Sequence, residues 1–418
     1  MKFFRKIHLW LSIPFGIIIT LICFSGGMLI FEPEITRSIE RGKYYVESDR
    51  DTVIPLGNLM ETVKTSLPDS VKITGVTIFP DNKRSYQVNL SGEHHRSIFI
   101  DQYTGKILGE YKRPEFFLTM LKLHRWLLDS GSNKSGGGKT GKLIVGISTI
   151  VFVIVLLTGI VLWAQRARRN FKKSLVISAR YGRGILWRGL HVAGGMYAVI
   201  FILAMALTGL TWSFKWYKDA FYNVCGVEQT SQNSREDKKA PNDISSVRKK
   251  NQDSQNQYSK EIPEIRTKSE RNAKSERNAL KEKKTALSLY SGWQNVYDTL
   301  ASQNPGATEI TIRPGTASVT FGSFGNTRKA DIYRFNIISG ETSPLISYAD
   351  SADTAKLSGW IQSVHTGVWG GILTRLLWLI AALLGASLPL TGYYIWIKRT
   401  WKRKVKKLPA TQNRSSMP

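Results

Sequence analysis

The sequence predicts an α-helical membrane protein with four transmembrane helices in two parallel repeats, together with two small α+β domains outside the membrane. Three observations support this fold class. Four long apolar runs interrupt a chain of 418 residues whose formal net charge is +28. Blocks of basic residues without acidic neighbours flank these runs. The two halves of the chain also resemble each other, span for span and domain for domain.

Each apolar run is long enough to cross a bilayer, which takes about 20 helical residues. The first run follows the basic start MKFFRK, as in a secretory signal peptide. It has no convincing small-residue cleavage site, so we interpret it as a retained anchor. The four predicted spans are residues 8–31, 142–164, 190–214 and 372–397.

The basic residues predict the orientation of the spans. Nineteen of the 28 net positive charges lie in three blocks without Asp or Glu, residues 2–6, 165–188 and 398–418. Such blocks beside a span stay on the cytoplasmic side. Both termini and the basic loop are therefore expected inside, with residues 32–141 and 215–371 outside. This distribution also argues against a nucleic-acid-binding protein, despite a sequence pI near 10.

The spans align in pairs as a tandem repeat. His8 and His191 begin the first and third spans, and each is followed by a hydroxyl residue at +17 and a glycine at +18. The second and fourth spans align on similar pairs. The four pairs are Ser25-Gly26, Thr158-Gly159, Thr208-Gly209 and Thr391-Gly392. Small residues at these positions favour close approach of helices. Room for a macrocyclic cofactor is the alternative interpretation.

The external segments repeat as well. Residues 32–113 and 215–355 each predict one small α+β domain with a helix followed by strands of alternating polarity. The helices are expected at 55–67 and 290–302, and the strands at 72–79, 84–91, 96–101, 308–313, 316–321 and 331–337. The second domain contains the stretch 228–290, which is polar and charged with almost no aromatic residues. We expect a disordered insertion there, or alternatively a partner-binding arm.

Four of the six histidines occupy equivalent places in the two halves. His8 and His191 are expected near the cytoplasmic face. His124 and His365 lie in short helices before the second and fourth spans, residues 114–130 and 356–371, near the outer face. Two imidazoles at equal depth can supply the two axial ligands of a haem iron. The sequence therefore predicts an inner and an outer haem b, each held between repeats. A duplicated structural histidine that bonds a neighbouring helix is the alternative.

Other side chains are candidates for supporting roles. Arg125 and Arg375 lie on the outer side, where the topology rule does not require them, and are possible partners of haem propionates. His94 and His95 lie in a polar turn and could contact a metal or substrate. Cys23 and Cys225 alone cannot form a thiolate metal site. The chain contains no nucleotide-binding or flavin motif, so a separate electron donor is required.

The chain resembles the bacterial PepSY-associated transmembrane proteins. The resemblance rests on four blocks in order, IHLW…SGG, LHRWL, LHVAGG…TGLTWSF and VHTGVWGG…LTGYYIWIKR, and on FIDQYTGKILG at the end of the first external domain. It covers nearly the whole chain outside 228–290 and the C-terminal tail, residues 398–418. The resemblance implies that both external domains are PepSY-like and periplasmic. It also implies that the four histidines named above bind haem.

The leading functional hypothesis is a di-haem protein of the bacterial inner membrane. It would carry electrons from a quinol or a cytoplasmic reductase to ferric iron in the periplasm, and the resemblance implies a ferric-siderophore as the acceptor. The alternative is a haem-free membrane anchor whose PepSY-like domains bind or regulate a periplasmic partner. A transporter component is a third hypothesis, without a broken-helix signature to support it.

Overall fold

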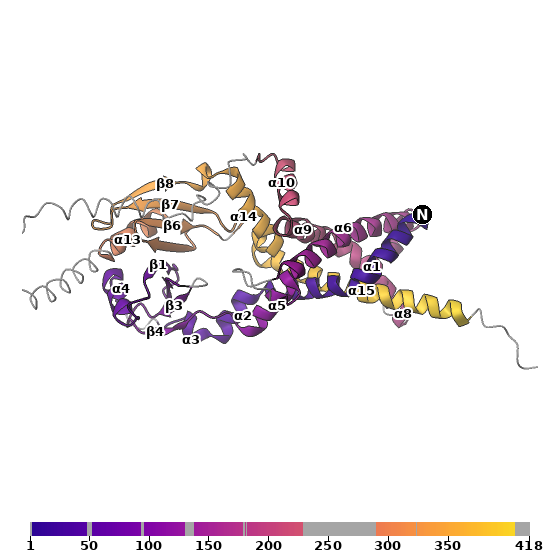
Figure 1. The fold of residues 1–418 in the computed structure, drawn as a ribbon, viewed down its shortest axis with the longest axis horizontal. Helices are drawn as coiled ribbons and strands as arrows, with labels where there is room; N and C mark the ends of the chain where they lie inside the picture. The colour runs from indigo at the N-terminus through magenta and orange to yellow at the C-terminus, as the bar shows by residue number, and fades with distance from the viewer. Residues whose placement is uncertain are drawn as a thin grey trace, which may run out of the picture.

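The computed structural model describes residues 2–47, 52–92, 96–129, 138–178, 180, 182–228, 290–322 and 324–405. They form a long helical bundle with an antiparallel sheet beyond one end (Figure 1). We call that end of the bundle the sheet end. The opposite end, where the N terminus lies, is called the basic end. Apart from its first and last residues, the predicted insertion 228–290 lies outside the described residues.

Four helices are long and apolar enough to cross a membrane, as the sequence predicted. The first, second and fourth are α1 (Lys2–Leu29), α6 (Lys139–Ala167) and α15 (Gly371–Val405). The third is continuous through α8 (Arg183–Gly189), a π-helical turn η1 (Leu190–Gly194) and α9 (Gly195–Ser213). Several helices continue past the predicted spans at the basic end, where a charged helical turn can project from the bilayer into water.

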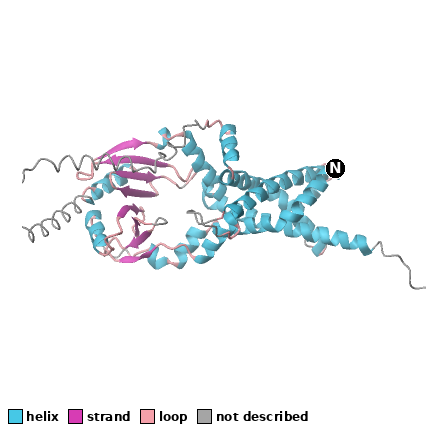
Figure 2. Ribbon diagram, in the orientation of Figure 1, coloured by secondary structure: helices cyan, strands magenta, loops and turns pink. Residues whose placement is uncertain are grey.

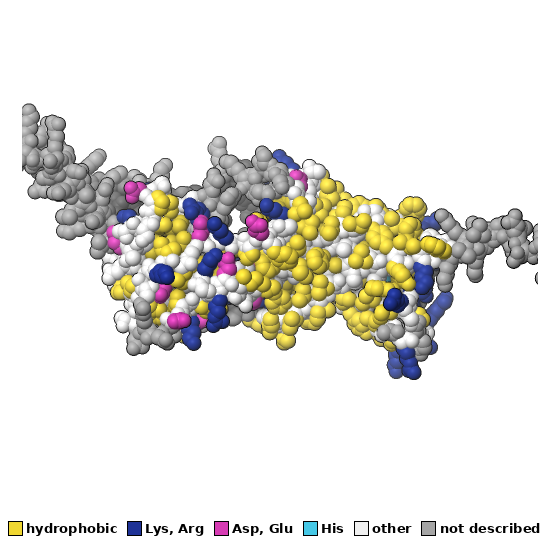
Figure 3. Space-filling view, turned by 90° about the horizontal axis from the view of Figure 1, so that it is seen from below, with side chains coloured by type: hydrophobic (Ala, Val, Ile, Leu, Met, Phe, Trp, Pro, Cys, Tyr) yellow, Lys and Arg dark blue, Asp and Glu magenta, His cyan; other side chains and the backbone are white. Residues whose placement is uncertain are grey.

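The four long helices pack around a common apolar core. α1 contacts α6 and α15, and α9 contacts the same two helices from the other side. The core side chains include Ile19, Phe152, Leu156, Ile202 and Leu388. Other apolar side chains, such as Ile17 and Ile200, face outward. On the face shown in Figure 3, hydrophobic side chains cover most of the bundle, as a lipid-facing surface requires. The chain is therefore a multi-pass membrane protein.

Short helices connect the bundle to the sheet. α5 (Glu115–Trp126) packs on α1 and α6, and α14 (Asp353–Thr366) packs on α9. Both end at a residue with a left-handed backbone, Leu127 and Gly367, which turns the chain toward the next span. The remaining short helices are α2 (Glu32–Ile39), α3 (Arg41–Tyr44), α7 (Phe171–Ser174), α10 (Lys215–Val224), η3 (Tyr348–Asp350) and η4 (Val368–Gly370).

In the described residues of both external segments, one helix is followed by four strands. In the first, α4 (Leu56–Thr65) precedes β1 (Ile73–Ile78), β2 (Tyr86–Leu90), β3 (Ser97–Ile100) and β4 (Ile107–Glu110). In the second, α13 (Trp293–Gln303) precedes β5 (Glu309–Arg313), β6 (Thr316–Thr320), β7 (Ala330–Phe335) and β8 (Thr342–Ile346). The sequence predicted the helices and three strands of each segment, but not β4 or β8.

The two segments share a single sheet (Figure 2). Its strand order is β4-β3-β2-β1-β5-β6-β7-β8, so the halves join where β1 pairs antiparallel with β5. Thr77 lies opposite Thr311 at this junction, and their hydroxyl oxygens are 2.9 Å apart. α4 and α13 supply Leu59 and Trp293 to one apolar core that includes strands of both halves. The predicted α+β units are thus halves of one sheet, not separate cores.

Candidate functional site

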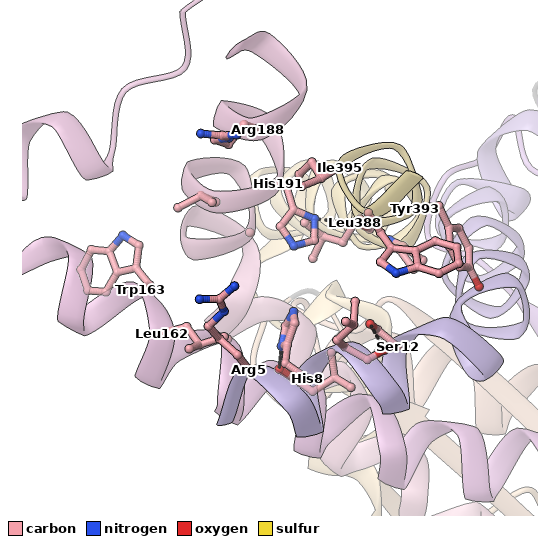
Figure 4. Close-up of a pocket in the computed structure, with 18 of the residues that line it drawn as sticks. Arg5, His8, Ser12, Leu162, Trp163, Arg188, His191, Leu388, Tyr393 and Ile395 are labelled. Carbon is pink, nitrogen blue, oxygen red and sulfur yellow. Dashed lines mark hydrogen bonds between the residues drawn. The ribbon is translucent and has the colours of Figure 1, made fainter. Parts of the chain in front are cut away.

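His8 and His191 face each other at the basic end. His8 lies on α1, and His191 lies in the π-helical turn η1. Their ring centroids are 6.2 Å apart and the ring planes are perpendicular. Figure 4 shows the two imidazoles directed toward one another across the space between their helices. The sequence predicted this pair, and the structure brings it together.

His124 and His365 form the corresponding pair at the sheet end. They come from α5 and α14, and their ring centroids are 6.1 Å apart with an interplanar angle of 51°. The indole of Trp212 lies edge-on to His365, at a centroid distance of 5.0 Å. The residue at the equivalent place in the first half, Leu29, is aliphatic. The two pairs therefore share a spacing, and the two halves of the repeat differ at this aromatic position.

Every one of the four imidazoles bonds a neighbouring helix through Nδ1. In each case Nδ1 lies within 3.0 Å of a main-chain carbonyl oxygen, at Val155 for His8, Leu388 for His191, Ile22 for His124 and Met205 for His365. A carbonyl oxygen can only accept, so Nδ1 carries the proton and donates it. Nε2 then keeps a free lone pair, as a metal ligand requires.

These bonds also show how much of each imidazole a purely structural role explains. The alternative prediction was a histidine that only bonds its neighbouring helix, and that bond is present at Nδ1. Within the described part of the chain, however, no hydrogen bond reaches Nε2 of His8, His191, His124 or His365. The structural role therefore accounts for one nitrogen of each ring and leaves the other available.

The hydroxyl–glycine pairs lie against the imidazoles. A Cβ atom added at Gly26 would lie 2.8 Å from Cε1 of His124, and one at Gly209 would lie 3.0 Å from Cε1 of His365. At the basic end the corresponding distances, from Gly159 to His8 and from Gly392 to His191, are both 3.4 Å. These glycines thus provide space for the imidazole itself, in addition to close helix approach.

Burial keeps the sheet-end rings neutral. It lowers the pKa of His124, and together with the charge of the facing His124 it lowers the pKa of His365 to about 4. Both rings are therefore uncharged at pH 7. Because only the neutral imidazole presents a lone pair, this pair is ready to coordinate a metal without first losing protons.

The side chains available as ligands fit a metal that is already bound by most of its ligands before it enters the protein. Within the described residues, no group of three or more His, Cys, Asp or Glu side chains could hold a bare metal ion. Two histidines alone fall short of the four ligands of a zinc site, whereas a haem iron needs only axial ligands from the protein. With metal–nitrogen bonds of about 2.0 Å and about 1.2 Å from nitrogen to ring centre, opposed imidazoles have centroids about 6.4 Å apart. The observed separations, 6.2 and 6.1 Å, fit this arrangement.

A large cavity opens at the basic end beside His8 and His191. Its volume is about 1870 Å³, and α1, α6, α8, α9 and α15 line it. Typical small-molecule pockets have volumes of about 300–1,000 Å³, so a group of haem size has room. Among the described residues, the lining contains no Asp or Glu. It includes the cationic side chains of Lys2, Arg5, Lys6, Arg166, Arg169, Arg183, Arg188, Lys398 and Arg399.

Comparison with known proteins agrees with this architecture. The model of the PepSY-associated TM region matches residues 5–399. The chain belongs to the PepSY-associated transmembrane family. No curated protein matches it. All four paired histidines of this PepSY-associated protein lie inside the matched range, as do the four hydroxyl–glycine pairs.

The two predicted propionate partners of this family member lie in different settings. Arg375 makes a two-pronged ion pair with Glu34 of α2, with both N–O distances 2.6 Å, and its guanidinium lies over the ring of Phe31. Arg125 is exposed, and its guanidinium lies 4.9 Å from the ring centre of Trp126. Arg375 thus holds α2 against α15. A role of either arginine toward a cofactor stays a prediction.

Several features of the site were not predicted. The π-helical turn at His191, the edge-on Trp212 and the carbonyl acceptors depend on helix geometry that periodicity does not reveal. The Thr hydroxyls could have been predicted, because each hydroxyl–glycine pair recurs at a fixed offset. Thr158 and Thr391 lie 3.1 and 3.0 Å from Nδ1 of His8 and His191. His94 and His95 lie outside the described residues.

Proposed function

We propose that this protein is a di-haem oxidoreductase that carries electrons through the bacterial inner membrane and reduces a ferric chelate in the periplasm. One observation carries the proposal. Two pairs of imidazoles, each spaced for one iron and each with Nε2 free, lie at opposite ends of the same bundle. A haem b bound at each pair supplies reversible one-electron chemistry.

The chain's own groups set the geometry of both sites. The carbonyl oxygens that accept from Nδ1 fix the tautomer and orient each ring, as outer-shell partners of metal ligands do. Cations around the basic-end cavity favour the carboxylates of a bound macrocycle. The glycine beside each imidazole keeps the ring close to its acceptor. Each ring therefore has one fixed direction in which to present Nε2.

The two pairs are separated by about the thickness of a bilayer core. Along α1, His8 and the glycine that contacts His124, Gly26, are 18 residues apart, or about 27 Å at 1.5 Å per residue. A hydrocarbon core is about 30 Å thick. We assign the basic end to the cytoplasm because Lys and Arg beside membrane spans stay inside. The sheet then lies in the periplasm as a pair of PepSY-like halves.

The acceptor class rests on the proposed side of the membrane and on the resemblance described above, which implies a ferric-siderophore. The hard oxygen ligands of such chelates hold Fe(II) less tightly than Fe(III), so reduction releases iron for uptake. The described chain carries no nucleotide-binding motif, and the electrons must come from a separate donor on the basic side. Under this proposal, electrons move in one direction, from the basic end to the sheet end.

The proposal can be tested on the purified full chain, expressed with added haem precursor. We expect two haems per chain by quantitation, with reduced spectra typical of two axial histidines. Mixing the reduced protein anaerobically with a ferric hydroxamate chelate should reoxidise the haem and produce Fe(II), detected by an Fe(II)-specific chelator. The gallium(III) chelate, which has the same shape but cannot be reduced, should produce no reoxidation.

Two outcomes would contradict the proposal. A well-folded chain without haem would favour the haem-free anchor that binds a periplasmic partner. A haem-loaded chain that never transfers electrons to any ferric chelate would support haem binding but contradict the proposed reductase activity.

A further inference from the structure

Exposed cations surround the mouth of the basic-end cavity. α1 contributes Arg5, the turn after α6 contributes Arg169, α8 contributes Arg183, and α15 contributes Lys398. Because three different helices and one turn supply them, the positive charge encloses the opening instead of following one lipid-facing side. Figure 4 shows Arg5 beside His8, and Arg188 in the helix that leads into the turn with His191.

The described chain provides no anion to neutralise this charge. In the described part of the chain, every Asp and Glu lies within residues 32–129 or 219–353, toward the sheet. A haem in the cavity would bring two carboxylates. With Arg399 left aside, eight described cations line the cavity, and two carboxylates would leave six of them without a counter-charge. A second anionic species therefore fits this end of the molecule.

The chemistry of the lining discriminates among electron donors. A quinol is uncharged, so it gains nothing from the cations, and its oxidation releases protons that call for a base. The cavity lining contains no carboxylate, and its two histidines already donate from Nδ1. A reduced nicotinamide delivers a hydride, which carries two electrons, whereas a haem accepts one. A soluble protein that carries single electrons matches the site better than either.

We propose that the rim of the basic-end cavity docks the acidic face of a soluble one-electron carrier protein. This inference rests on the proposed function for the direction of electron flow. One electron leaves the carrier and one haem iron accepts it, with no bond broken. Complementary charge on the two surfaces steers such encounters and fixes their orientation, and it makes the association depend on salt.

The test measures docking separately from electron transfer. The full chain is placed in nanodiscs of zwitterionic phosphatidylcholine, and binding of oxidised flavodoxin, an acidic one-electron carrier, is measured by biolayer interferometry. We expect saturable binding that weakens at least about tenfold between low and physiological salt. The triple variant Arg169→Glu, Arg183→Glu, Lys398→Glu should weaken binding by a similar factor or more.

Two further variants separate docking from folding and from net charge. The milder set Arg169→Gln, Arg183→Gln, Lys398→Gln should weaken binding by an intermediate factor. Lys64→Glu, Lys72→Glu, Lys83→Glu, on exposed positions of the sheet domain, makes the same change in net charge and should leave binding unchanged. Because the cavity cations also favour the carboxylates of a bound macrocycle, haem content is measured on each preparation and binding is compared between preparations of equal haem content, haem-free preparations included.

Equal flavodoxin binding by the unaltered and charge-reversed chains would overturn the inference and assign the cations to lipid headgroups or haem carboxylates. Because oxidised flavodoxin transfers no electron, this result is independent of the proposed function. A preparation that docks flavodoxin but contains no haem would instead contradict the proposed function and leave the docking surface standing.

Discussion

The two ends of the bundle hold their histidines by the same contacts but in different surroundings. At both ends an imidazole donates from Nδ1 to a carbonyl of a neighbouring helix and lies against a glycine. At the basic end the rings are perpendicular and border an open cavity. At the sheet end they are tilted by 51°, tightly packed against their glycines, and one of them contacts Trp212.

This difference shows that one local contact can be reused in two environments. The carbonyl and the glycine fix where the ring lies and which nitrogen is free. The surroundings then set how closely the ring is packed and what can reach it. We therefore expect the sheet-end pair to be the more sensitive to changes in volume and pH. The basic-end pair should be the more sensitive to charge.

The largest contrast is expected from matched glycine substitutions. Gly26→Ala would bring a methyl group to 2.8 Å from His124, so the ring must move away from its acceptor. Gly159→Ala places the methyl 3.4 Å from His8, which neighbouring atoms can accommodate. Haem quantitation should show loss of one haem from the first variant and retention of both in the second. Equal haem contents in the two variants would show that the closer packing of Gly26 against His124 does not affect haem binding.

The second-largest effect is expected from acidification, which should lower the stability of the sheet end. The pKa of His365 is about 4 in the folded chain and about 6.5 in the unfolded chain. Between these values only the unfolded chain binds the proton, so the stability of the haem-free protein falls as pH drops from about 6.5 to about 4. The pKa difference corresponds to about 3 kcal/mol. Denaturation of the unaltered chain and His365→Gln at pH 7 and pH 4.5 measures this.

His365→Gln should lose much less stability between pH 7 and pH 4.5, because the glutamine side chain does not titrate. His8→Gln is the matched control from the basic end and should keep the contribution of His365. If His365→Gln shows the same acid dependence as the unaltered chain, the buried ring is not its source.

A smaller effect is expected at Trp212. Its indole contacts His365 edge-on, and an aromatic pair of this kind contributes about 1 kcal/mol beyond its buried area. Trp212→Leu installs the residue type found at the equivalent position of the first half. We expect a stability loss of about 1 kcal/mol and an altered redox midpoint for one haem only. Trp10→Leu, whose ring is 71% exposed, is the control and should change neither.

The smallest effect is expected from the ion pair that ties α2 to α15. Burial raises the pKa of Glu34, but hydrogen bonds from Arg375 outweigh it, and the net pKa is lowered. The pair therefore stabilises the fold above the ordinary pKa of 4.5, and this contribution is lost as pH falls through the lower folded value. Since Glu34 is 41% exposed, Glu34→Gln should cost at most about 1 kcal/mol at pH 7. In unfolding curves the difference between the two chains should shrink as pH is lowered below 4.5, and a difference that does not depend on pH would indicate a packing effect instead.

Much of the fold followed from the sequence because its signals are strong. Each membrane span combines about 20 apolar residues with a basic flank, and the repeat matched His8 to His191 before any geometry was known. The same repeat identified both external helices and six of the strands. β4 and β8 were missed because they are short outer strands, and Pro344 in β8 weakens the strand pattern.

Other features could not follow from sequence patterns because they depend on how elements meet. Nothing in the alternation of β1 or β5 indicates that these two strands would pair and merge two units into one sheet. The pairing of Arg375 with Glu34 joins residues from opposite ends of the chain. The glycine beside each histidine was visible as a motif. Only the packing of the helices reveals that this glycine makes room for the imidazole.

The pairing of histidines across the two halves is tested most directly by haem stoichiometry in double variants. We expect two haems in the unaltered chain and one in either His8→Ala/His191→Ala or His124→Ala/His365→Ala. The crossed variant His8→Ala/His124→Ala removes one ligand from each pair and should retain none. A crossed variant that retains one haem, or an unaltered chain that binds none, would contradict the account.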